Sequence, residues 1–148
     1  MAAGKFFFYD IWGQKEASGD ISFMISGGIN AAVLKSSYTP GTHSHSLFSQ
    51  ISSHQATASG SIVNALALSG RHISISGIGN VKYVASNISG FSAGGATFKA
   101  KYLALYGASS SILMGFLDLD TGATTGVEVS QLDINWNSQG IAKNKLNQ

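Results

Sequence analysis

The sequence predicts an all-β fold, a β-sandwich of mostly antiparallel strands with one short helix. Three observations lead to this prediction. Apolar and polar residues alternate in runs of roughly six to ten residues, which is the pattern of half-buried strands. Glycine-rich turns separate these runs, and helical periodicity is almost absent. Many short strands joined by such turns are typical of a sandwich.

The chain of 148 residues is long enough for one domain with its own core. We divide it into an N-terminal segment, residues 1–18, and a β-sandwich domain, residues 19–148. The N-terminal segment is either an aromatic arm or an edge strand, because "FFFYDIW" at 6–12 is dense in aromatic residues. The following "QKEASGD" indicates a turn. If the segment is an arm that binds a neighbouring subunit, its partner-binding residues are Phe6, Phe7, Phe8, Tyr9 and Trp12.

The next segments predict two strands and a loop. "ISFMIS" at 21–26 places alternate apolar residues on one face, and a second strand begins at Ile29 after a pair of glycines. Residues 36–46 form a long polar loop centred on Pro40-Gly41, which is a strong turn pair.

The short helix is predicted directly after this loop. Leu47, Phe48 and Ile51 have the spacing of one helical face, and Ser44 or Ser46 stands where a capping residue is needed. Glycines then flank "IVNALAL", which favours a strand there.

The second half of the chain predicts a series of strands. Ile73 and Ile75 share a face, Gly77 shifts the phase as a bulge would, and Gly79-Asn80 forms a tight turn into the strand "VKYVASNIS". In "FKAKYLALYG" we expect Phe98, Tyr102 and Tyr106 on one face, and "SILMGFLDL" is the next strand. The alternation then slips near 130–131, which requires a bulge or an exchange of the chain between two sheets.

Charge is sparse along the whole chain. Only 11% of residues are charged, and the net charge is +2. Nucleic-acid binding requires clustered lysine and arginine, so no nucleic-acid partner is predicted. No apolar run reaches the about 18 residues of a membrane span, and we predict neither a signal peptide nor a membrane partner. A surface with so little charge either faces another protein or is a serine-rich exposed surface.

The stretch "DLDTG" at 118–122 raises three interpretations. An aspartic-protease half-site requires apolar residues before the aspartate, but Asp118 stands two positions before Asp120. A calcium loop of the EF-hand type requires a glutamate at its position 12, where Val129 stands if Asp118 is position 1, although a looser cation site is left open. The third interpretation, a β-turn whose aspartates bond to the backbone, is favoured.

Other candidate chemistry is equally weak. His43-Ser44-His45 places two imidazoles on one side of an extended segment, and three chains could together offer six nitrogen ligands to a transition metal. Loop histidines are more often solvated, however, and His54 and His72 have no partner that the sequence identifies. No Gly-x-Ser-x-Gly elbow occurs with a placed histidine and acid, and the spacing of a phosphate loop is absent. We therefore predict no catalytic residue, no metal-binding residue and no cofactor.

Three stretches taken together resemble a family of small virion proteins of tailed bacteriophages. They are "GDISFMISGGINAAVLKSSYTPGTHSHSLFSQI", "SGFSAGGATFKAKYLALYG" and "ILMGFLDLDTGATTGVEVSQLDINWNSQGI". The family's order of motifs matches a Ser-Ser-Tyr-Thr-Pro loop, a nearby His and Phe, a Tyr-containing strand, a Gly-to-Asp strand, and a terminal Trp followed by Gly-Ile. The matching positions are Ser36 to Pro40, His43 or His45, Phe48, Tyr102 to Tyr106, Gly115 to Asp118, Trp136 and Gly140-Ile141.

This resemblance implies a non-enzymatic capsid decoration (cement) protein. Its expected partners are the major capsid protein and itself, as a homotrimer. Its expected location is the surface of the phage head, after assembly in the host cytoplasm. The chain has no cysteine, which agrees with assembly in a reducing compartment. The alternatives are a tail or fibre-tip module that binds receptor glycans, and a small hydrolase built on Asp120 or a serine.

Overall fold

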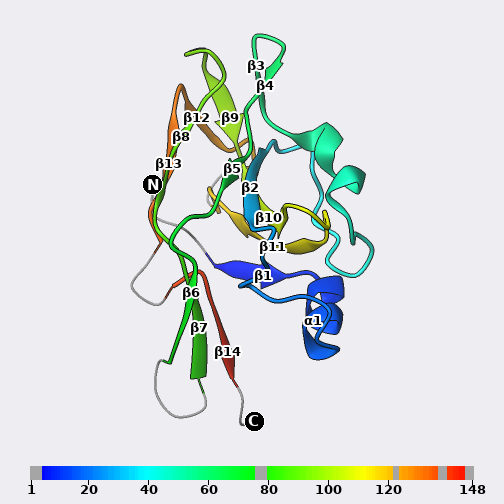
Figure 1. Ribbon diagram of the computed structural model, residues 1–148. Coiled ribbons are helices and arrows are strands. Elements are labelled where there is room, and N and C mark those ends of the chain that lie inside the picture. Colours follow the sequence, from blue (N-terminus) through cyan, green and yellow to red (C-terminus); the bar gives the residue numbers. More distant parts are fainter. Residues whose placement is uncertain (1–4, 76–79, 122–123, 137–139, 146–148) are drawn as a thin grey trace.

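A computed structural model describes residues 5–75, 80–121, 124–136 and 140–145. Strands dominate these residues, together with one α-helix and two short 3-10 turns, which confirms the all-β prediction (Figure 1). The elements are β1 (Phe6–Phe8), α1 (Asp10–Ala17), β2 (Ile29–Leu34), η1 (Phe48–Gln50), η2 (Ser52–His54), β3 (Thr57–Ala58), β4 (Ser61–Ile62), β5 (Leu66–Ala67), β6 (His72–Ile75), β7 (Asn80–Val84), β8 (Ile88–Phe91), β9 (Phe98–Ala100), β10 (Tyr102–Gly107), β11 (Leu113–Asp118), β12 (Val127–Val129), β13 (Leu132–Ile134) and β14 (Ala142–Lys145).

A central antiparallel sheet of five strands organises the molecule. Its strand order is β1-β11-β10-β2-β5. Its middle strands β2, β10 and β11 are buried almost throughout, since alternate side chains enter two different clusters of core residues. Leu103 and Leu105 belong to the larger cluster, whereas Ala104 and Tyr106 belong to the smaller one. Burial on both faces explains why these strands are continuous apolar runs.

Smaller antiparallel sheets complete the fold. They pair β12 with β9, β13 with β8, β3 with β4, and β7 with both β14 and β6. Residues of β8, β9 and β13 enter the larger cluster, so these strands form a second layer against the central sheet. Figure 1 shows the β14-β7-β6 sheet extending away from the body at the end opposite to the β3–β4 hairpin.

The N-terminal segment is an edge strand followed by a helix. β1 pairs with β11, where a Cβ atom added at Gly115 would lie 2.6 Å from the carbonyl oxygen of Phe7, so only glycine permits this approach. The helix α1 corrects the predicted turn over 14–20. It lacks an amphipathic pattern, with Trp12 as its fully buried side chain. Tertiary contacts hold it instead, because Trp12 is buried in the core and the hydroxyl of Tyr83 donates a hydrogen bond to the carboxylate of Glu16. Within the helix, the indole N–H of Trp12 donates to the same carboxylate.

The short helix predicted around 47–51 is not an α-helix. The chain forms the 3-10 turns η1 and η2 there. Neither predicted serine cap is used. The side-chain oxygen of Gln50 instead accepts hydrogen bonds from the backbone N–H groups of Ser46 and Leu47, at 2.7 and 2.9 Å. This contact satisfies backbone N–H groups at the start of η1 that have no partner within the turn.

The strand predicted over 21–26 is also a correction. Ile21 and Phe23 are buried as the alternation predicts, but their backbone forms turns. The guanidinium of Arg71 donates hydrogen bonds to the carbonyl oxygens of Phe23 and Ile25, at 2.6 and 3.2 Å. A side chain therefore satisfies backbone groups that a neighbouring strand would otherwise satisfy.

The alternation of side chains changes phase between β9 and β10. Phe98 enters the larger cluster, whereas Tyr102 packs against the smaller cluster and Tyr106 belongs to it, so the prediction that all three share one face is wrong. The break falls at Lys101, which interrupts the two strands. The predicted slip near 130–131 is present as a change of partner, since β12 pairs with β9 and β13 with β8.

The predicted bulge at Gly77 and the first residue of the predicted turn at Gly79-Asn80 lie outside the described residues. β6 and β7, which flank them, are antiparallel neighbours as expected. No helix among the described residues is long and apolar enough to cross a membrane.

Candidate functional site

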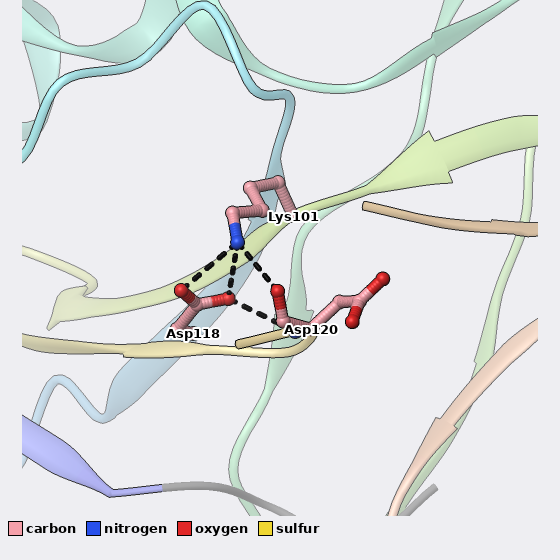
Figure 2. Close-up of polar contacts among 3 residues, drawn as sticks. All are labelled: Lys101, Asp118 and Asp120. Carbon is pink, nitrogen blue, oxygen red and sulfur yellow. Dashed lines mark hydrogen bonds and ion pairs between the residues drawn. The ribbon is translucent and has the colours of Figure 1, made fainter. Parts of the chain in front are cut away.

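Lys101 and Asp118 form a buried ion pair at the end of the central sheet. Asp118 ends β11, and its neighbour in register on β10 is Tyr102, so Lys101 lies beside it. The ammonium Nζ lies 2.9 and 3.0 Å from the two carboxylate oxygens of Asp118 and 2.5 Å from the carbonyl oxygen of Asp120 (Figure 2). The side chain of Lys101 is 8% exposed and that of Asp118 is 24% exposed.

The turn at residues 118–121 is built around this pair. The backbone N–H of Asp120 donates a 2.9 Å hydrogen bond to Asp118 Oδ1, which is the side-chain-to-backbone bond that the turn interpretation predicts. The N–H of Leu119 donates to the carbonyl oxygen of Lys101 at 2.8 Å. In Figure 2 the carboxylate of Asp120 points away from Lys101. Asp118 thus anchors the turn, while Asp120 contributes only its backbone to these contacts.

This arrangement suits a structural brace rather than an acid or base. The two carboxylate oxygens of Asp118 already accept hydrogen bonds from Lys101 and Asp120. An aspartic-protease centre instead requires two carboxylates that share one proton. Here the charged partner of Asp118 is a lysine, and the carboxylate of Asp120 points away from the pair (Figure 2). The sequence carries a weak signal for this brace, because Lys101 directly precedes the apolar run "YLALYG".

The loop histidines bind separate partners. His43 Nδ1 forms a hydrogen-bonded pair with Asp10 Oδ2 at the start of α1. His45 Nδ1 lies 3.4 Å from the hydroxyl of Tyr38, which in turn contacts the hydroxyl of Tyr9. Burial raises the pKa of Tyr9, and the Tyr38 hydroxyl raises it further. Within the described ranges, no three His, Asp or Glu side chains converge on a point where they could hold a metal.

The contact between His43 and Asp10 predicts a pH-dependent link between the 36–46 loop and α1. The hydrogen bond to Asp10 raises the pKa of His43 above its ordinary value of about 6.5. The stabilisation is therefore complete below pH 6.5 and disappears as the pH rises through the raised pKa. His43→Gln should lower the melting temperature slightly at pH 5.5 and leave it unchanged at pH 9.

Asp10→Asn is the matched control for this prediction. It should remove the same increment at pH 5.5, and the double variant should lose no more than either single variant. Equal losses at both pH values would contradict the proposed link. The effect is small because both side chains are largely exposed.

The predicted partner-binding residues divide into three groups by their exposure. Tyr9 and Trp12 are fully buried in the chain's own core, so their rings are not available to a partner. Phe6 and Phe8 are partly buried and pack against the larger cluster. Phe7 is 42% exposed and lies over Phe116, with the ring centres 5.4 Å apart. Phe7 therefore keeps a surface that a partner can reach.

Sequence reasoning missed the apolar face of the extending β6–β7 sheet. Ile73 is opposite Tyr83 and Ile75 is opposite Val81 in the antiparallel register, so the four side chains share one face. Tyr83 is buried and Val81 packs against the core, but Ile73 is 47% exposed and Ile75 is 80% exposed. The core therefore covers the Tyr83 and Val81 side of this apolar face, and the Ile73 and Ile75 side remains exposed to solvent.

Comparisons with known proteins give no relative. No protein-family model, no curated protein and no solved structure matches the chain.

Proposed function

We propose that this chain is a non-enzymatic structural protein of a tailed-phage virion, a decoration protein that binds the major capsid lattice and stabilises the head as a homotrimer. The observation that carries the proposal is the uncovered apolar face at Ile73 and Ile75. Exposed apolar side chains that continue a buried face mark a contact with another protein. β6 is also an edge strand of its described sheet, so its backbone can pair with a strand from a neighbour.

The poverty of charge supports the same proposal. Interface cores are depleted in lysine, glutamate and aspartate, and only 11% of this chain is charged. Phe7 adds a second exposed apolar position on the edge strand β1 of the central sheet. A subunit that contacts both the capsid and other copies of itself requires more than one such surface.

Replacing Ile73 and Ile75 together with lysine tests the proposal. The double variant should stay folded, because both side chains are largely exposed, and should bind phage heads assembled without the protein about tenfold or more weakly. Cosedimentation of purified protein with such heads measures this affinity. Ile62→Lys is the matched control, since Ile62 is 53% exposed but lies in the β3–β4 hairpin at the other end of the molecule (Figure 1).

Light scattering separates the two kinds of neighbour. Loss of the trimer in the double variant assigns the face to another copy of the chain. Weaker head binding by an intact trimer assigns it to the capsid protein. Unchanged binding and unchanged oligomeric state would overturn the assignment of this face, and immunogold labelling of tails rather than heads would overturn the decoration function itself.

A further inference from the structure

Two neighbouring cavities meet at Ser36, beside the Lys101–Asp118 pair. The first has a volume of about 410 Å³ and the second about 390 Å³, each within the range of small-molecule sites. The first is lined by Ser36, Tyr38, Thr39, Pro40, Lys101, Tyr102, Thr121 and Thr124. The second is lined by Lys35, Ser36, Thr57, Thr97, Phe98, Lys99 and Glu128. We call the two together the Ser36 groove.

The first cavity offers hydroxyl groups without net charge. Its serine and three threonines can each donate and accept hydrogen bonds. Its charged lining residue, Lys101, is neutralised by Asp118 and is therefore not free to hold an anion. The partly buried ring of Tyr102 and the ring of Pro40 add apolar surface. Hydroxyl groups beside a ring face fit a sugar, whose hydroxyls need such partners and whose C–H face is apolar.

The second cavity differs in its charge. Lys35 and Lys99 contribute two positive charges and Glu128 one negative charge. Lys99 and Glu128 are opposite each other in the β9–β12 register, so Lys35 supplies the excess. An acidic group on a ligand that extends past Ser36 would meet this excess.

We propose that the Ser36 groove binds an oligosaccharide, with a neutral unit in the first cavity and an acidic unit in the second. The site is independent of the proposed decoration function, because none of its residues lies in β6 or β7. The two can therefore fail separately. A decoration protein with this groove would present a carbohydrate-binding site from the particle to which it is attached.

A glycan array probed with the full chain tests the proposal directly. We expect the bound glycans to be enriched in members that carry a carboxylate, and we expect the strongest of them to shift the amide resonances of Ser36, Thr39 and Tyr102 in NMR spectra. No bound glycan, or shifts confined to residues outside the groove, would overturn the proposal.

Three variants separate the two cavities. Thr39→Val combined with Thr121→Val changes the first cavity alone and should weaken binding of the strongest array ligand about tenfold, since each lost hydrogen bond costs roughly a few-fold in affinity. Thr125→Val is the matched control, because Thr125 is exposed and is next to Thr124 but does not line the cavity. Lys35→Gln should weaken binding of 3′-sialyllactose while leaving that of neutral lactose unchanged. Equal effects on both sugars would contradict the acidic subsite.

Discussion

Replacing Trp12 with alanine is expected to destabilise the protein by about 3–5 kcal/mol, a large part of the 5–15 kcal/mol that holds a typical domain together. Trp12 is fully buried and is among the largest side chains in the core. Its truncation leaves a cavity beneath α1 and removes a hydrogen bond to Glu16. Thermal unfolding followed by circular dichroism should show a melting temperature lower by many degrees.

Gln14→Ala is the matched control on the same helix. Gln14 is exposed, so its replacement should change the free energy of unfolding by about 0.5 kcal/mol at most. Deleting residues 1–12 should unfold the domain, because it removes the buried side chains of Tyr9 and Trp12 together with the strand β1. A deleted chain that stays folded but no longer assembles would instead show that the N-terminal segment is an arm for a partner.

Replacing Asp118 with alanine is expected to destabilise the protein by about 3 kcal/mol. The substitution leaves the ammonium of Lys101 buried without its carboxylate partner, and it removes the bond that anchors the turn at Asp120. The partial exposure of Asp118 places the effect at the lower end of the range for buried pairs. Urea unfolding measures the loss as a lower midpoint at an unchanged slope.

Two further variants isolate the buried charge as the cause. Asp120→Asn should be nearly neutral, because the carboxylate of Asp120 points away from Lys101 and only its backbone holds the brace (Figure 2). Lys101→Met combined with Asp118→Leu should recover most of the lost stability, since it removes the unpaired charge together with its partner. A double variant as unstable as Asp118→Ala would show that the turn bond, and not the charge, is decisive.

The strands of the central sheet were the easiest elements to predict. β2, β10 and β11 are mostly apolar runs of six residues, and burial of both faces of the sheet accounts for that pattern. α1 could not be predicted, because its side chains carry no helical stripe and its stability comes from Trp12 and from Tyr83, more than sixty residues away in the chain. A local sequence pattern cannot predict a helix whose stability depends on contacts with distant residues.

The candidate sites show the same division between local and distant information. The turn at Asp118 was predictable, since its side-chain bond connects residues two positions apart. Its partner Lys101 was not predicted, because only the pairing of β10 with β11 brings the two together. The alternation of Ile73 and Ile75 with polar residues was evident in the sequence. The sequence could not show, however, that no other part of the described fold packs over these two side chains. Surface exposure is a property of the whole fold.

The position of β1 has a consequence for synthesis of the chain. Its phenylalanines leave the ribosome more than a hundred residues before their partner β11. Such distant pairing gives a high contact order and slow folding. Until β11 emerges, "FFF" is an exposed apolar segment with no strand to pair with. Nascent chains at high local concentration can associate through it. A chaperone that covers residues 6–8 until β11 has emerged would therefore limit this association during translation.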